Sequence, residues 1–166
     1  NIPINTYFSL DLDGISALND SVGGVDVVSP ETIGEFVEGE SYHLVGQQAE
    51  SFVRTRDTSK TDSNNMRMQR QKVYIQSFMN TVLQQTKKDL TTPIDLFNAS
   101  APYSCTNLNP SKVSYLAQQA VLGGMNGIDM VSVPGQVTMG SKYAEFNVSE
   151  AESYQLFLSI YYTKIE

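Results

Sequence analysis

The sequence predicts a layered α/β fold, in which helices pack against β-strands within a single domain. Segments rich in β-branched and aromatic residues alternate along the chain with segments whose apolar residues recur at helical spacing. This alternation is typical of folds in which helices cover a sheet. The 166 residues are 40% hydrophobic and 17% charged, which is enough apolar material for one packed core and too much for a disordered protein.

The first third of the chain is predicted to form strand, helix, strand and helix. These elements are expected over residues 4–12, 15–22, 25–29 and 46–56. β-Branched and aromatic residues favour the two strands, and Asp13-Gly14 supplies a turn after the first strand. A Gly-Gly pair favours the C-terminal cap of the first helix. The second helix is amphipathic, with Ala49, Phe52 and Val53 facing the core.

The rest of the chain carries the longest predicted helix. The expected elements are a helix from about residue 65 to residue 90, a Pro-containing loop over 98–110, a helix over 110–122, strands over 128–135 and 141–148, and a helix over 149–162. Asn64 or Asn65 is the candidate N-cap of the long helix, and Pro93 ends it. Pro110 stands at the favoured first position of its helix, and Ser149 opens the last helix with a Ser-x-x-Glu capping box.

All the arginines of this acidic chain lie in one window. They are Arg54, Arg56, Arg67 and Arg70, in a chain of net charge −7. Arg67, Arg70 and Gln71 stand at i, i+3 and i+4 on one face of a helix, near an N-terminus that favours anions. Arg54 and Arg56 point the same way if their segment is extended. We expect at least three guanidinium groups to converge on one cleft that binds an anion such as pyrophosphate.

A salt-bridge network is the alternative for the same window, because Glu50, Asp57 and Asp62 lie near the arginines in the sequence. The acidic balance argues against general nucleic-acid binding, which needs a broad basic surface. A single cysteine, Cys105, and a single histidine, His43, exclude a zinc site built from these residues. His43 has no partner nearby in the sequence, so a structural or surface role is favoured.

Several motifs resemble the LytR-CpsA-Psr family in order and spacing. The match begins with GGVDVV and continues through LVGQQA, VRTR and NNMRMQRQ to CTNLNPSKVSYL, SVPG and FNVSEAESYQLF. Each motif is weak by itself, but Arg-x-Arg followed by Arg-x-x-Arg-Gln after Leu-x-Gly-x-x-Ala is fairly specific. Residues 1–166 are similar to the C-terminal two-thirds of one such domain, with the family's N-terminal part missing.

The resemblance implies a fold and an activity. The family fold is an αβα sandwich with a central mixed sheet and a hydrophobic pocket for a polyprenyl chain. Such proteins are phosphotransferases of the cell envelope, mainly in Gram-positive bacteria. They move teichoic acid or capsular polysaccharide from a polyprenyl-pyrophosphate carrier to peptidoglycan. They work on the extracytoplasmic face of the cytoplasmic membrane, to which an N-terminal anchor attaches them. The fragment alone is expected to be inactive.

The resemblance also implies roles for individual residues. Arg54, Arg56 and Arg67 are the expected catalytic residues. The family usually has an aspartate where this chain has Asn64, so Asp62 is the candidate to replace it as proton acceptor. The expected substrate-binding residues are Arg54, Arg56, Asn64, Arg67, Arg70 and Gln71. The resemblance implies a Mg²⁺ cofactor whose ligands belong to the missing N-terminal part, so no metal ligand is assigned in this chain.

Two other functions stay open at this stage. The first is a non-catalytic module that binds envelope lipids or polymers, which the asparagine at position 64 favours. The second is a transcriptional attenuator or regulator. The net negative charge and the lack of a helix-turn-helix signature argue against that second function.

Overall fold

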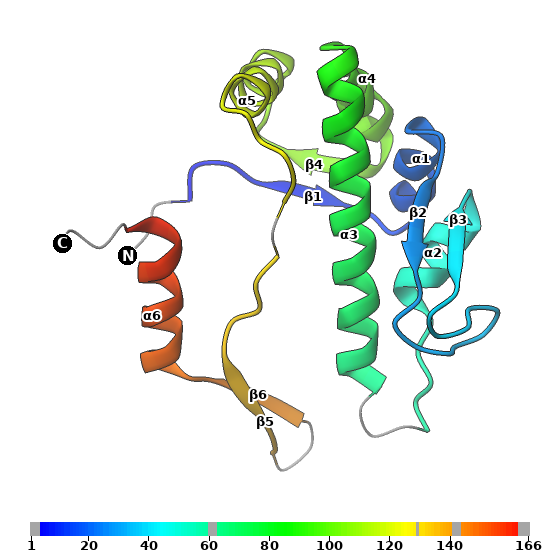
Figure 1. Ribbon diagram of the computed structural model, residues 1–166, viewed down its shortest axis with the longest axis vertical. Helices are drawn as coiled ribbons and strands as arrows, with labels where there is room; N and C mark the ends of the chain where they lie inside the picture. The colour runs from blue at the N-terminus through cyan, green and yellow to red at the C-terminus, as the bar shows by residue number, and fades with distance from the viewer. Residues whose placement is uncertain (1–3, 60–62, 129, 141–143, 163–166) are drawn as a thin grey trace. The chain divides into compact units, whose positions relative to one another are not determined.

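One long helix, α3 (Ser63–Lys88), is the element against which much of the chain packs (Figure 1). The computed structural model describes residues 4–59, 63–128, 130–140 and 144–162.

The chain divides into two compact units, residues 1–129 and 130–166. The other elements of the first unit are β1 (Phe8–Leu10), α1 (Asp13–Ser21), β2 (Val25–Val28), β3 (Ser41–Leu44), α2 (Gln47–Arg54), α4 (Thr92–Ser100), the 3₁₀ turn η1 (Ala101–Tyr103), β4 (Ser104–Thr106) and α5 (Pro110–Leu122). The second unit has β5 (Gly135–Met139), β6 (Ala144–Val148) and α6 (Glu150–Tyr161).

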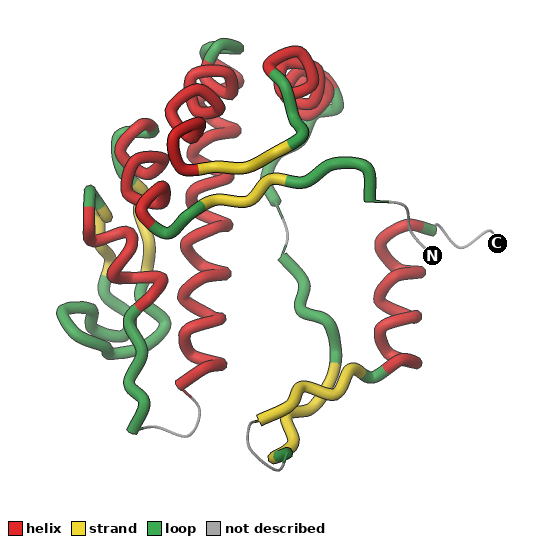
Figure 2. Tube along the Cα trace, turned by 180° about the vertical axis from the view of Figure 1, so that it is seen from behind, coloured by secondary structure: helices red, strands yellow, loops and turns green. Residues whose placement is uncertain are grey.

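The predicted mixed α/β class is confirmed. The strands of the described residues hydrogen-bond as three antiparallel pairs, β1–β4, β2–β3 and β5–β6, rather than as one continuous sheet. Each strand is only three to five residues long, so each offers a short hydrogen-bonding edge. In the β1–β4 pair Phe8 is opposite Thr106, so two strands that are far apart in the sequence lie side by side (Figure 2).

The core of the first unit lies where α3 packs against β2 and α2. Ala49, Phe52 and Val53 of α2 are buried there, as their spacing predicted. The ring of Phe36 meets the ring of Phe52 edge to face, with their centroids 5.0 Å apart. From α3, Tyr74 is buried in the same core. None of the helices in the described ranges combines the length and the apolar character that a membrane crossing requires.

Two predicted segments are wrong. The loop expected over 98–110 holds the end of α4, η1 and β4, because Pro93 lies in the first turn of α4 instead of only ending the preceding helix. Proline fits the first turn of a helix, and the partner of β4 is the distant β1, which local composition does not reveal. The strand expected over 128–135 is also absent: residues 130–134 are irregular, and β5 begins at Gly135.

Helix boundaries follow the sequence more closely. The helix α5 has the predicted bounds, and its N-cap Asn109 accepts a hydrogen bond from the backbone N–H of Lys112. The helix α3 begins at Ser63, two residues before the predicted start, so Asn64 lies in its first turn instead of capping it. Ser149 is the N-cap residue of α6 as predicted, but its side chain makes no capping hydrogen bond within the described structure.

A buried asparagine joins three elements of the first unit. The side-chain amide of Asn19 in α1 donates to the carbonyl of Leu44 in β3 at 2.8 Å, and the Tyr74 hydroxyl of α3 donates to Asn19 Oδ1 at 3.3 Å. Asn19 is fully buried. Burial raises the pKa of the Tyr74 hydroxyl, so it stays protonated and remains a donor. The packing of α1, β3 and α3 therefore depends on one polar side chain.

Asn19→Ala is expected to lower the free energy of unfolding by about 1–3 kcal/mol, because it leaves the buried Leu44 carbonyl and Tyr74 hydroxyl without partners. Urea unfolding followed by circular dichroism measures the change. Asn98→Ala, at an exposed position of α4, is the matched control and should change the stability little. Equal stability of the two variants would contradict this assignment.

Candidate functional site

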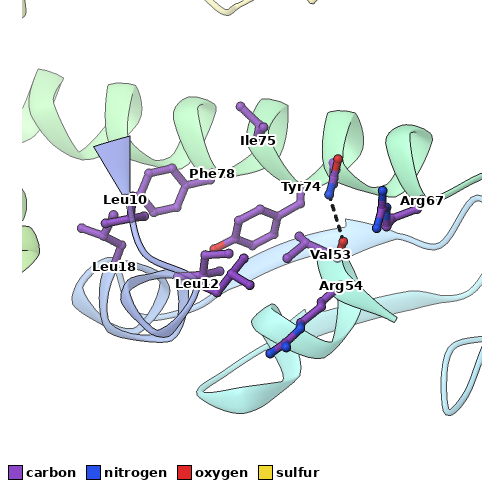
Figure 3. Close-up of a pocket in the computed structure, with 11 residues that line it drawn as sticks. Leu10, Leu12, Leu18, Val53, Arg54, Arg67, Tyr74, Ile75 and Phe78 are labelled. Atoms are coloured by element: carbon purple, nitrogen blue, oxygen red, sulfur yellow. Dashed lines mark hydrogen bonds between the residues drawn. The ribbon is translucent and has the colours of Figure 1, made fainter. Parts of the chain in front are cut away.

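An open, mostly apolar cavity of about 500 Å³ lies along α3 in the first unit. Its lining residues come from β1, α1, α2, α3 and the short segment between β1 and α1 (Figure 3). They are Leu10, Leu12, Ile15, Leu18, Val53, Arg54, Arg67, Gln71, Tyr74, Ile75 and Phe78. Leu10, Leu18 and Phe78 gather at one end, and Arg67 lies at the other. The cavity thus joins an apolar wall to cationic side chains.

Two arginines from different helices line the cavity. Arg54 is the last residue of α2, and its Nη1 donates to Glu50 Oε1 at 2.7 Å. The Glu50 side chain is largely buried, whereas that of Arg54 is 62% exposed. Arg67 of α3 donates from Nη2 to Asn64 Oδ1 at 2.9 Å. Its Nε is buried and meets no acceptor among the described residues.

Gln71 and Asn64 make hydrogen bonds that fix the arginine end of the cavity. The Gln71 side-chain amide donates to the Val53 carbonyl at 3.2 Å, which ties α3 to the end of α2. Asn64 accepts the hydrogen bond from Arg67, and its own amide donates to the Met68 sulfur at 3.6 Å. Asn64 therefore orients Arg67 and, as an amide, carries no charge and accepts no proton.

Arg70 lies in the core rather than in the cavity. Its side chain is fully buried, with Nη1 donating to the Phe52 carbonyl at 2.9 Å and Nη2 donating to the Thr55 carbonyl. Its Nε lies 2.9 Å from Glu31 Oε1, out of line for a hydrogen bond, so this contact is an ion pair. Burial lowers the pKa of Arg70, and the carboxylate of Glu31 opposes that effect.

The structure thus brings two of the four guanidinium groups to the cavity, where at least three were expected. Adjacent residues point about 100° apart around a helix, so Arg70 turns to the core while its neighbour Gln71 faces the cavity. Arg56 donates from Nε to Ser63 Oγ at 3.0 Å and does not line the cavity. Asp62, the expected proton acceptor, lies outside the described residues.

The alternative of a salt-bridge network holds in part, since Glu50 pairs with Arg54 and Glu31 pairs with Arg70. Sequence reasoning missed Glu31, because it lies far from the arginines in the sequence and carries no spacing signal. It also missed the apolar wall formed by β1 and α1, which reaches the cavity only through tertiary packing.

His43 belongs to a different place in the fold. It lies opposite Asp26 in the β2–β3 pair, with Nδ1 2.7 Å from Asp26 Oδ1 and Nε2 3.0 Å from the Gly23 carbonyl. Two oxygen acceptors favour the doubly protonated ring, and the hydrogen bond with Asp26 is the main cause that raises the pKa of His43. Both ring nitrogens thus face acceptors of the protein itself, which favours a structural role for His43.

The described residues do not offer a donor set for Mg²⁺. In the described ranges no three side chains of His, Cys, Asp or Glu come together closely enough to hold a metal ion. The polar groups that line the cavity are two cations and an amide, whereas Mg²⁺ prefers carboxylate oxygens. The residues present therefore do not fit this ion.

Comparison with known proteins assigns the family. A sequence profile of the LytR_cpsA_psr family matches residues 1–158. The chain belongs to the LytR_cpsA_psr family. This confirms the membership that the motifs around the arginine window indicated. No curated protein matches the chain.

Solved structures share the fold of this LytR_cpsA_psr domain. B. subtilis TagV is 21% identical with a TM-score of 0.69, and the match covers 98% of this chain and 66% of TagV. The LytR-Csp2A-Psr enzyme from Actinomyces oris is 17% identical with a TM-score of 0.69, covering 98% and 65%. TagT bound to LI-WTA is 14% identical with a TM-score of 0.67, covering 96% and 60%. The chain therefore spans 60–66% of the length of these three structures.

Glu31→Ala is expected to lower the free energy of unfolding by about 3–5 kcal/mol, because it leaves the buried cation of Arg70 unpaired. Urea unfolding at neutral pH measures this loss. Glu38→Ala removes an exposed carboxylate from the same segment and should change the stability by less than about 0.5 kcal/mol. A Glu31 variant as stable as the Glu38 variant would show that the ion pair contributes nothing.

The stability contributed by His43 is expected to be present below the pKa of the unfolded state, about 6.5, and to be lost as the pH rises through the higher folded pKa. Asp26→Asn removes the main cause of that rise. The wild type should therefore exceed Asp26→Asn in stability by more at about pH 5.5 than at about pH 8.5. Urea unfolding at both pH values tests this, and a constant difference would contradict the protonated pair.

Proposed function

We propose that this chain forms the lipid- and pyrophosphate-binding part of a cell-envelope transferase that moves a glycopolymer from a polyprenyl-pyrophosphate carrier to peptidoglycan. The observation that supports this most is the cavity itself, which joins an apolar wall to Arg54 and Arg67. A prenyl pyrophosphate has the same division, with an apolar chain and an anionic head.

The physical chemistry of each end favours such a ligand. The apolar lining gains about 25 cal/mol for each Å² of apolar surface that a chain buries against it. At the other end, Arg67 has a buried Nε without an acceptor in the described structure, and Arg54 is mostly exposed. Guanidinium groups bind phosphate oxygens through paired, charge-assisted hydrogen bonds. Family membership and the likeness to TagV, to TagT bound to LI-WTA and to the A. oris enzyme support the same class of activity.

In the proposed reaction an acceptor hydroxyl of peptidoglycan attacks the phosphorus that carries the glycopolymer. The new oxygen–phosphorus bond forms as the bond from that phosphorus to the bridging oxygen breaks, and polyprenyl phosphate leaves with the electron pair. Arg54 and Arg67 stabilise the charge that develops on the leaving group. A carboxylate takes the hydroxyl proton, a role we propose for Asp62.

The proposed location follows from the proposed substrates. The carrier lipid and peptidoglycan meet at the extracytoplasmic face of the cytoplasmic membrane, so we place the transferase in the cell envelope of a Gram-positive bacterium. Attachment to the membrane by the N-terminal anchor that the family resemblance implies is part of the same proposal, as is the use of Mg²⁺ by the whole protein.

A binding module without transferase activity is the second candidate, and Asn64 favours it. The amide at this position accepts a hydrogen bond from Arg67 and offers no carboxylate next to the arginine end of the cavity. A chain that binds the carrier lipid but does not transfer its polymer would correspond to this function. Binding and transfer therefore need separate measurements.

Arg54→Ala and Arg67→Ala are each expected to weaken the binding of a short-chain prenyl pyrophosphate by about 1.5–3 kcal/mol, because each removes a charge-assisted contact with the head group. Isothermal titration of the full chain measures the affinity. The prenyl alcohol of the same length should bind both variants and the wild type alike. Lys112→Ala, which removes an exposed cation from α5, is the matched control. Unchanged affinity in both arginine variants would remove the proposed role.

A further inference from the structure

Side chains of α3 donate hydrogen bonds to backbone carbonyls on both sides of Arg54. Arg70 donates to the carbonyls of Phe52 and Thr55, and Gln71 donates to the carbonyl of Val53. These carbonyls flank Arg54 in the sequence. We propose that Arg70, paired with Glu31, is a positioning residue that fixes the end of α2 and so directs Arg54 at the head group. The inference rests on the proposed function and assigns Arg70 a role other than direct substrate contact.

The position of these carbonyls explains why they need side-chain donors. The last four carbonyls of a helix have no partner within the helix. In α2 the Ser51 carbonyl accepts from the Thr55 N–H at 3.0 Å, while Phe52 and Val53 depend on Arg70 and Gln71. Since the C-terminal end of a helix carries partial negative charge, a buried cation there is also favourable. Without these donors the last turn of α2, which carries Arg54, would lose its fixed conformation.

Glu31 makes the buried cation possible. It is buried in the segment between β2 and β3, and its own carbonyl accepts a hydrogen bond from Ser29 Oγ at 2.7 Å. Its carboxylate lies 2.9 Å from Arg70 Nε. The pair therefore links the β2–β3 segment, α3 and the end of α2. A lysine at position 70 would keep the positive charge, but it could not donate hydrogen bonds to both carbonyls in the geometry of the guanidinium group.

Both the backbone and the side chain of Arg54 are thus held in place. Its backbone is held through Arg70 and Gln71, and its side chain is held by the largely buried Glu50 at 2.7 Å. A guanidinium that is already ordered loses less conformational freedom when an anion binds, and that raises the affinity for the anion without any new contact. The expected effect of Arg70 is therefore on binding of the charged head, not of the apolar chain.

The test uses the full chain with Arg70→Met and Glu31→Leu combined. This double variant removes one positive and one negative charge, and replacing a buried ion pair with apolar side chains of similar volume often preserves stability. We expect affinity for a short-chain prenyl pyrophosphate to fall on the order of tenfold, with affinity for the matching prenyl alcohol unchanged. Exchange of the Thr55 amide hydrogen should be faster than in the wild type. Arg70→Lys should show the same selective loss.

A double-mutant cycle separates action through Arg54 from any other effect. On an Arg54→Ala background, the combined Arg70→Met and Glu31→Leu change should weaken pyrophosphate binding little further. Wild-type affinity in the double variant, full affinity in Arg70→Lys, or equal losses for pyrophosphate and alcohol would each overturn the inference. A wild-type chain that binds the alcohol but not the pyrophosphate would instead overturn the proposed function, and this inference with it.

Discussion

The first unit depends on one constraint. It holds a buried positive charge that has no access to water, so partners inside the protein must compensate for it. Removing a charge from water costs several kcal/mol unless partners compensate for it. Arg70 finds those partners in Glu31 and in the carbonyls of Phe52 and Thr55, each from a different segment than α3. The packing of α2 and of the β2–β3 segment against the long helix is therefore specified by donor geometry as well as by apolar burial.

The same constraint divides the arginine window between the core and the cavity. Arg70 is buried in the core, whereas Arg54 and Arg67 line the cavity. Each of the cavity arginines is also held by one neighbour, Glu50 or Asn64, and keeps donors for an anion. An acidic chain can place so many cations together because part of the charge is neutralised by Glu31 and Glu50 and the cavity arginines lie beside an open space.

Local signals in the sequence predicted the features that depend on local chemistry. The bounds of α5 follow from Pro110 and the Asn109 cap, and the inward face of α2 follows from its spacing. The arginine end of the cavity was predicted in part, because Arg67 and Gln71 share a helical face. Glu31, β4 and the apolar wall were not predicted, since each acts through contacts between distant segments. The sequence also could not separate Arg70 from Arg67, because helical spacing does not say which side of the helix is buried.

Because β1 pairs with the distant β4, the segments that form the two ends of the cavity are completed at different times during synthesis. The arginine end is built from α2 and the first turns of α3, which are close in the sequence. The opposite wall includes Leu10, whose strand pairs with residues 104–106, and the Asp11 N–H bonds to the Tyr103 carbonyl at 2.8 Å. We therefore expect that a growing chain can form the cationic end before the apolar end, because β4 emerges later and contacts between distant segments carry a larger loop-closure cost than local ones.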